Sequence, residues 1–256
     1  MRNLVKVGKG TIKTLAERLG YKIIGLPQIT SRYPDDLAYA LNVPTAGYAP
    51  WLLDSDFRSV FNKVSDHTLL DEYRAYALWS LAGEAAKLPE GDVIEVGVWR
   101  GGSGCLLAKR FATLAPSAVV YLADTFSGVV KSSSVDRGYG DGAHSDATRQ
   151  IVVDLAEGID AHVEIMQGVF PDETGHAVAG NKFRFAHIDI DVYESAKAIL
   201  DWLWPRLLHE AIVVFDDYGF VSCPGITHLV NDRRQKKDCI FIHNLTGQGI
   251  LIKRTK

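Results

Sequence analysis

From residue 66 onward, short apolar runs alternate regularly with segments of helical periodicity. The apolar runs predict strands at 92–97, 119–124, 162–167, 183–189 and 211–216, and the periodic segments predict helices at 67–88, 102–115, 145–157, 194–208 and 225–237. This alternation is typical of a mostly parallel sheet with helices on both faces. Residues 239–254 hold two further apolar runs around a Gly-containing turn, which predicts a C-terminal hairpin. The chain is therefore expected to form a seven-stranded α/β sheet whose last strand is reversed.

Carboxylates stand where two of these strands should end. Asp189 and Asp191 follow one apolar run, and the adjacent pair Asp216 and Asp217 follows another. In an open α/β sheet, ligands bind outside the carboxyl ends of the strands, so the four side chains should meet in one crevice. Such a cluster repels itself unless a cation shares it, and Mg²⁺ prefers oxygen ligands. The pattern predicts a Mg²⁺-type site.

A glycine-rich loop, EVGVWRGGSG (95–104), follows the first predicted strand and opens a helix. It has neither the GxGxxG spacing of a dinucleotide site nor the GK[ST] ending of a P-loop. Glu95 would repel a pyrophosphate, but it suits a cationic sulfonium or ammonium group. Asp124 ends the next predicted strand, where an acidic residue can bind ribose hydroxyls. Together these features favour S-adenosylmethionine over a dinucleotide as the ligand.

Composition excludes several other classes of function. The net charge is −3 and no basic stripe with interleaved aromatic residues is present, so no nucleic-acid partner is indicated. Three scattered cysteines without metal-ligand spacing predict free thiols in a reducing compartment, consistent with a cytoplasmic location. No stretch approaches the ~18 consecutive apolar residues of a transmembrane segment. Residues 1–22 are basic with apolar residues at roughly helical spacing, which predicts either a solvated helix packed on its own domain or peripheral contact with a membrane or a partner subunit.

Two regions are predicted to cover the site. Residues 1–65, irregular from residue 25 onward, are expected to form an N-terminal lid, substrate pocket or oligomer contact, with the catalytic domain at 66–256. The Gly/Ser-rich loop at 128–145 is long for a compact domain and is a second candidate lid. Its His144 either approaches the substrate or is solvated near the following helix, and the second interpretation is preferred. His187 is expected to be a hydrogen-bonded core histidine.

Five sequence blocks closely resemble the macrocin O-methyltransferase family, the TylF/MycF/NovP group, whose members methylate sugar hydroxyls. The blocks are DVIEVGVWRGGSG, LADTFSG, MQGVFPD, HIDIDVYESAKAILDWLWPRL and VVFDDYGF. The resemblance covers about residues 66–256. It implies the class I methyltransferase (Rossmann-like) fold, S-adenosyl-L-methionine and Mg²⁺ as cofactors, a sugar-bearing substrate and a homo-oligomer.

The resemblance also implies roles for individual residues. By motif, the metal ligands are Asp189, Asp216 and Asp217, and the general base is Asp191. The cofactor contacts are expected at the loop and strand ends, namely at Glu95, Gly97, Ser103, Asp124, Gly168 and Val169. Asp172 is an equally good candidate for the adenine side or for a helix cap.

Three alternatives remain open at the level of sequence. A metal-dependent glycosyltransferase also uses a DxD motif, but it would leave the glycine-rich loop and the second acidic pair unexplained. A catechol-type methyltransferase shares the fold, cofactor and metal, and usually takes a lysine as its base. Here Lys197 lies farther from the metal-ligand motif than Asp191, which favours a sugar acceptor. A non-catalytic binding protein is disfavoured by the complete set of acids.

Overall fold

The computed structural model describes most of the chain from residue 46 onward and isolated parts of the N-terminal region. The described residues are 12, 14–16, 18–21, 23, 36–40, 42, 46–132, 136 and 138–255. Contacts divide the chain into two compact units, residues 1–43 and 44–256. The amphipathic helix predicted within residues 1–22 lies largely outside the described residues. Within the described part, no helix is both long enough and apolar enough to span a membrane.

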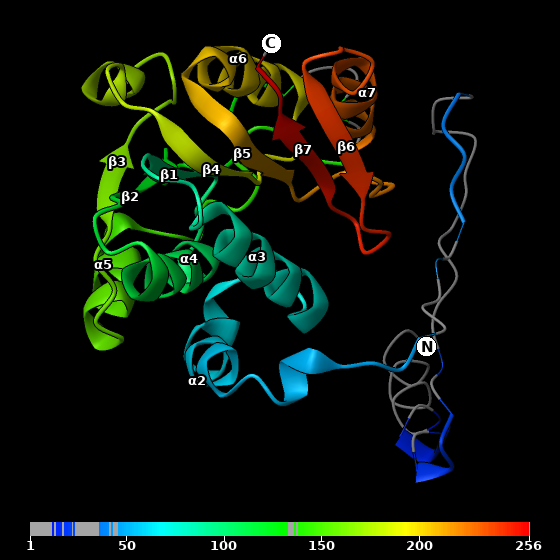
Figure 1. Cartoon of the computed structure of the whole chain (residues 1–256). Coiled ribbons are helices and arrows are strands. Elements are labelled where there is room, and N and C mark those ends of the chain that lie inside the picture. Colours follow the sequence, from blue (N-terminus) through cyan, green and yellow to red (C-terminus); the bar gives the residue numbers. More distant parts are fainter. Residues whose placement is uncertain are drawn as a thin grey trace. The chain divides into compact units, whose positions relative to one another are not determined.

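Residues 44–256 contain the predicted seven-stranded sheet, which Figure 1 shows. The strands are β1 (Asp92–Val96), β2 (Val120–Asp124), β3 (Glu164–Gln167), β4 (Phe183–Ile188), β5 (Leu207–Phe215), β6 (Cys239–His243) and β7 (Gly249–Lys253). Their spatial order is β3-β2-β1-β4-β5-β7-β6. Strands β1 to β5 pair in parallel, whereas β7 is antiparallel to both β5 and β6. The prediction of a mostly parallel sheet with a reversed final strand is confirmed.

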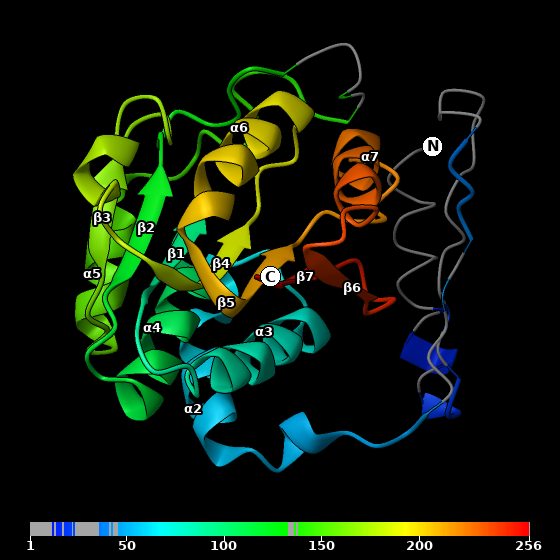
Figure 2. The same cartoon turned by 45° about the horizontal axis from the view of Figure 1, so that its top comes forward.

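Helices cover both faces of the sheet. They are α2 (Ser55–Val64), α3 (Glu72–Ala85), α4 (Gly102–Leu114), α5 (Arg149–Gly158), α6 (Tyr193–Leu203) and α7 (Pro224–Arg233). Figures 1 and 2 show α3, α4 and α5 on one face and α6 and α7 on the other. Successive strand side chains point to opposite faces, so Val93 joins the core under α3 and α4 while Ile94 joins the core under α6.

Helix α2 packs within the second unit. Phe57 and Val64 are buried in the same apolar cluster as Leu78 of α3 and Leu106 of α4. The sequence analysis grouped residues 55–64 with the N-terminal segment, and the contacts instead place them with residues 44–256. The roles predicted for residues 1–65 as lid, substrate pocket or oligomer contact stay predictions.

Element boundaries differ from the predicted ones where a capping residue or proline intervenes. Helix α5 begins at Arg149, not 145, because the Thr148 side chain caps it by accepting from the Ile151 N–H. Helix α6 ends at Leu203, not 208, because Pro205 cannot continue it. The chain then passes through a short 3₁₀ turn, and β5 begins several residues earlier than predicted.

Candidate active site

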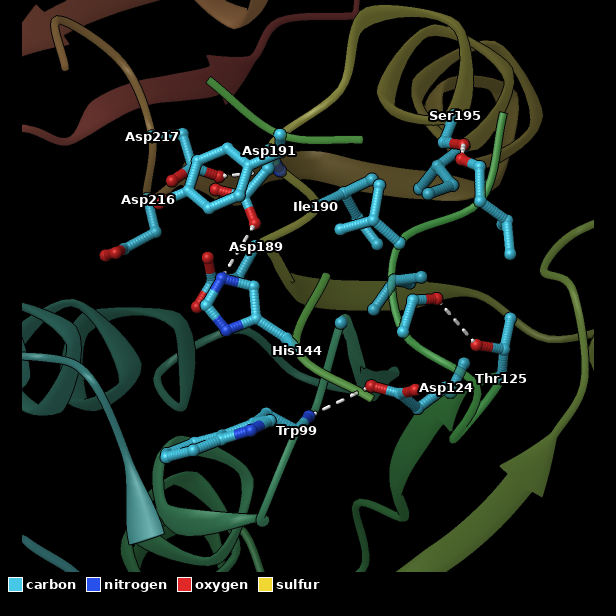
Figure 3. Close-up of a pocket in the computed structure, with 18 of the residues that line it drawn as sticks. Trp99, Asp124, Thr125, His144, Asp189, Ile190, Asp191, Ser195, Asp216 and Asp217 are labelled. Atoms are coloured by element: carbon cyan, nitrogen blue, oxygen red, sulfur yellow. Dashed lines mark hydrogen bonds and ion pairs between the residues drawn. The ribbon is translucent and has the colours of Figure 1, made fainter. Parts of the chain in front are cut away.

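A cavity of about 220 Å³ opens at the carboxyl ends of the central strands. The strand order reverses between β1 and β4, so the cavity lies at the switch point where α/β sheets bind ligands. Its wall combines the glycine-rich loop, the ends of β2, β4 and β5, and the segment after β2. Figure 3 shows the four predicted aspartates on one side of this pocket and Trp99 and Asp124 on the other.

Gly97 is the residue that lets two strand ends meet. It has a left-handed backbone, with φ of +88°, and a Cβ placed there would lie 1.8 Å from the Asp189 carbonyl oxygen. Only glycine tolerates this approach without displacement of the backbone. Gly97 lines the cavity, and its position brings the glycine-rich loop against the backbone of Asp189, the first residue of the acidic cluster.

Asp124 holds the glycine-rich loop in place. Its Oδ2 accepts from the backbone N–H groups of Val98 (2.7 Å) and Trp99 (2.9 Å), and its Oδ1 accepts from the Phe126 N–H (2.7 Å). A carboxylate has about four acceptor positions, two on each oxygen. Asp124 therefore keeps about one position, on Oδ1, for a ligand hydroxyl.

The segment after β3 completes this side of the pocket. Gly168 and Val169, which are predicted to contact the cofactor, line the cavity. The Gly168 N–H donates to the Asp124 carbonyl at 2.9 Å, which joins this turn to the end of β2. Asp172 is not among the described residues that line the cavity; its carboxylate instead pairs with Lys131 Nζ at 2.6 Å on the exposed surface.

Two predicted cofactor residues lie outside the cavity wall. Glu95 and Ser103 are buried, and neither belongs to the cavity wall within the described part of the chain. Glu95 points to the sheet face covered by α4, where a Cβ on Gly104 would lie 2.5 Å from its Oε2. Alternation along β1 explains the difference, because Val96 and the loop after it reach the pocket while Glu95 turns into the core. Contact of Glu95 and Ser103 with a cofactor stays a prediction.

The predicted convergence of acids is present. One oxygen from each of Asp189, Asp216 and Asp217 lies within 4.8 Å of the others. Asp191 lies beside them, and its N–H donates to Asp217 Oδ2 at 3.0 Å. Asp191 also has a left-handed backbone, with φ of +64°, which turns its side chain into the same cavity. Three closely spaced carboxylate oxygens fit a hard cation such as Mg²⁺.

Burial makes this cluster costly without a cation. It raises the pKa of Asp189 well above the usual value, and the charge of Asp216 raises it further. Burial and the charge of Asp189 likewise raise the pKa of Asp217. A divalent cation would favour the ionised form of both groups, so the donor set fits the predicted metal.

Asp216 differs from its neighbours because protein groups already bond both of its oxygens. Arg74 Nη1 donates to Oδ2, and Gln248 Nε2 donates to Oδ1 at 2.9 Å. Although burial acts to raise its pKa, His187 and Arg74 together lower it. The sequence analysis missed Arg74 and Gln248. Arg74 offered a signal, a charge within an apolar helical stretch, whereas Gln248 is one polar residue in a turn.

His187 is a buried core histidine, as predicted. Its ring Nδ1 lies 2.6 Å from Glu95 Oε1, and its Nε2 lies 3.8 Å from Asp216 Oδ1. Burial alone would lower the pKa of His187, but the two carboxylates raise it to about 10. The three side chains form a row across β1, β4 and β5 beneath the pocket. Glu95 therefore reaches the acidic cluster through His187.

The segment after β2 places His144 against the acidic cluster. His144 lines the cavity with its Nε2 4.0 Å from Asp191 Oδ2, and its ring packs at 5.3 Å from that of Tyr139. His144 is exposed to solvent, as the preferred interpretation had it, and it also reaches the cavity. Its place at the cavity depends on a tertiary contact: the segment is tied back to α6, where Ser195 Oγ donates to the Val130 carbonyl at 3.0 Å. Tyr139 and Phe220 also line the cavity and were not predicted.

Comparison with known proteins identifies relatives of this chain. The sequence model of the family described as "Macrocin-O-methyltransferase (TylF)" matches residues 80–244. The chain is 27% identical over 217 residues to 8-demethyl-8-(2,3-dimethoxy-alpha-L-rhamnosyl)-tetracenomycin-C 4'-O-methyltransferase of Streptomyces olivaceus, covering 80% of each protein. It is 30% identical over 181 residues to demethyldecarbamoylnovobiocin O-methyltransferase of Streptomyces niveus, covering 65% of this chain and 67% of the relative.

Solved structures show the same fold. The O-methyltransferase NovP superposes with a TM-score of 0.61 at 24% identity, covering 74% of this chain and 83% of NovP. The calicheamicin methyltransferase CalS11 superposes with a TM-score of 0.61 at 16% identity, covering 81% of this chain and 94% of CalS11. The class I methyltransferase architecture that the family resemblance implied is therefore confirmed.

Proposed function

The chain belongs to the macrocin O-methyltransferase (TylF) family and is an O-methyltransferase, and from this premise we propose that it methylates a sugar hydroxyl with S-adenosylmethionine and Mg²⁺. The observation that carries the proposal is the composition of the pocket. A glycine-lined side and a cluster of four carboxylates share one cavity of about 220 Å³. The first side suits a nucleoside cofactor and the second suits a cation with a hydroxylated acceptor.

The glycine-lined side would hold S-adenosylmethionine, which supplies an activated methyl group when bound. The bare backbone at Gly97 and Gly168 permits close approach of a ligand. The remaining acceptor position on Asp124 would take one ribose hydroxyl, and Val169 would contact the adenine. Glu95 would act indirectly, by orienting the buried ring of His187 through the contact between them.

Asp189, Asp216 and Asp217 would hold Mg²⁺, which when bound acts as a Lewis acid that lowers the pKa of a coordinated hydroxyl. Their oxygens are close enough together to share one ion. Placement of these three donors at the ends of two adjacent parallel strands fixes them on a rigid part of the fold. Orientation of an acceptor relative to the cofactor is the contribution expected to matter most in an in-line transfer.

Asp191 would accept the proton of the acceptor hydroxyl. Its carboxylate faces the cavity, and its backbone bond to Asp217 fixes it beside the metal ligands. Its Oδ1 lies 3.4 Å from the thiol of Cys223, and its Oδ2 lies near His144. A positioned general base of this kind typically contributes a factor of about 10² to 10⁴ in rate.

The catechol-type alternative is weakened by the position of Lys197. Its Nζ pairs with Asp201 at 2.7 Å on the exposed side of α6, and it is not among the described residues lining the cavity. The names of the relatives point to sugars as well, since one carries a rhamnosyl group in its name. A cytoplasmic location, a homo-oligomer and membrane contact through residues 1–22 stay predictions.

Calorimetric titration of S-adenosylhomocysteine and Mg²⁺ into the parent and an Asp217→Asn variant tests the two binding sites. The amide introduced by this substitution would keep an acceptor for the Asp191 N–H but lose the charge. We expect nucleoside binding in both proteins and a loss of Mg²⁺ affinity in the variant. Methyl transfer to glycosides with neighbouring free hydroxyls, with and without EDTA, then tests the acceptor class. Absence of nucleoside binding in the folded parent would refute the proposed activity.

A further inference from the structure

Arg74 is fixed at the edge of the acidic cluster by its own helix start. Asp71 caps α3 by accepting the N–H groups of Tyr73 (2.9 Å) and Arg74 (3.0 Å). The same carboxylate accepts from Arg74 Nε at 2.9 Å, and Arg74 Nη2 donates to the Leu69 carbonyl at 2.8 Å. The guanidinium therefore has two anchors besides the cluster, and its placement does not depend on the cluster alone.

The remaining guanidinium nitrogen, Nη1, pairs with Asp216. The pair is largely removed from solvent, with 11% of the Arg74 side chain and 2% of the Asp216 side chain exposed. Both residues line the cavity, and the Phe220 ring covers the guanidinium at 5.0 Å. Salt screens a buried pair much less than an exposed one, so the Arg74 charge is felt by an ion bound beside it.

The Arg74 charge lies next to the carboxylates that could bind a cation. Asp216 supplies an oxygen to the group that could hold a metal, and the same carboxylate is the partner of Arg74. Its second oxygen accepts from Gln248, which is completely buried. Because each oxygen already accepts one hydrogen bond, a divalent ion that binds Asp216 must share an oxygen with a protein donor, and it is repelled by the fixed positive charge of Arg74.

We propose that Arg74 is an internal counter-cation of the acidic cluster that competes with the divalent metal for Asp216 and so weakens metal affinity. The proposal rests on the proposed function, because it assumes that the cluster is a metal site. Arg74 thereby becomes a residue that sets the metal concentration at which the enzyme works.

Titration of Mn²⁺, followed by electron paramagnetic resonance of the free ion, tests the proposal in the full chain. The variants are Arg74→Gln, which removes the charge, and Arg74→Lys, which keeps it. We expect Arg74→Gln to bind Mn²⁺ at least about tenfold more tightly than the parent, because a nearby unit charge no longer repels the ion. Arg74→Lys should stay within about threefold of the parent. Equal or weaker binding by Arg74→Gln would overturn the proposal.

Two further measurements separate this outcome from loss of folding and from failure of the proposed function. Thermal unfolding should show Arg74→Gln less stable than the parent without Mn²⁺ and more strongly stabilised by it, since ligand binding stabilises the folded state. S-adenosylhomocysteine affinity should be the same in all three proteins. If the parent binds Mn²⁺ and a folded Arg74→Gln shows no gain, only the role of Arg74 fails. If none of the three binds Mn²⁺, both the role of Arg74 and the metal site fail, while nucleoside binding still reports on the methyltransferase activity.

Discussion

The two sides of the pocket are stabilised by different interactions. The glycine-lined side is held together by bonds to the backbone, because its carboxylate, Asp124, accepts three backbone N–H groups. The acidic side consists of charged side chains with strongly perturbed pKa values, including Asp189 and Asp217. One side is therefore set by chain geometry, whereas the other is set by the balance of buried charges.

The difference also lies in where the parts come from. The glycine-lined side is formed chiefly by consecutive strand–loop–helix units, as at β1 and α4. The acidic side gathers Arg74 from α3, Asp189 from the end of β4, Asp216 from the end of β5 and Gln248 from the turn before β7. We infer that the first side resists substitution through backbone strain and that the second resists it through electrostatics.

Removal of the proposed general base, Asp191, should have the largest effect of the substitutions considered. Asp191→Asn should lower the rate of methyl transfer by about 10³-fold, because the amide cannot accept the hydroxyl proton. Asparagine tolerates the left-handed backbone at this position, so no new strain is introduced. Single-turnover kinetics with a glycoside acceptor measures the effect.

The control for this variant is binding. S-adenosylhomocysteine and Mn²⁺ affinities should match those of the parent. A loss of metal affinity would instead make Asp191 a ligand, and full activity would remove it from the reaction.

Gly97→Ala tests the glycine-lined side through stability. The added Cβ would meet the Asp189 carbonyl oxygen at 1.8 Å in a backbone with φ of +88°, so the strand ends must separate. Backbone strain and overpacking together should cost about 3 kcal/mol of unfolding free energy. Urea denaturation gives the value. Gly158→Ala is the matched control, because nothing lies within 4 Å of its Cβ position and its φ is not in the left-handed range; its stability should stay close to that of the parent.

This contrast also explains what could be predicted from the sequence. Local periodicity predicts the strands, and the rule that ligands bind at their carboxyl ends predicts the meeting of Asp189 with Asp216 and Asp217. Both follow from the order of residues along the chain and need no knowledge of contacts between distant residues. The direction of Glu95 was not anticipated, because its functional motif and its alternation along β1 point to opposite sides, and alternation prevailed.

Tertiary contacts account for the site residues that the sequence did not predict. Arg74 reaches Asp216 across 142 residues of sequence, and Gln248 reaches it across 32. His144 reaches the pocket because the loop folds back on α6, which no periodicity encodes. Such pairings depend on the packed fold, so a single sequence shows only the unpaired charge and not its partner.

His144→Asn tests a residue that lies beside Asp191 on the acidic side of the pocket. Asparagine keeps the left-handed preference needed at φ of +61° but removes the imidazole that packs on Tyr139. We expect about a tenfold loss of kcat/KM for the acceptor, the order of one lost polar contact. S-adenosylhomocysteine affinity should not change. An unchanged kcat/KM would show that His144 lines the pocket without contributing to turnover.

The smallest effect is expected at an ion pair that lies away from both sides of the pocket. This pair tests whether opposite charges alone, without burial, give an interaction as strong as that in the acidic cluster. Asp238 accepts two bonds from Arg233, at 2.7 and 2.8 Å, and one from Trp204 Nε1 at 2.8 Å. These bonds lower the pKa of Asp238 to about 2. Its side chain is 46% exposed, so solvent screening limits its contribution to stability to about 1 kcal/mol or less.

The sign of the pH dependence follows from the lowered pKa. Because the folded state holds the proton less tightly than the unfolded chain, the stabilisation is complete above the unfolded pKa of about 3.9 and is lost as the pH falls toward about 2. Asp238→Asn should therefore be slightly less stable than the parent at neutral pH, and urea midpoints should converge between about pH 4 and pH 2. A loss of several kcal/mol at neutral pH would contradict this, because a half-exposed pair would then match the buried pair of Arg74 and Asp216 in strength. In that case, burial would not be what distinguishes the acidic side of the pocket from an exposed ion pair.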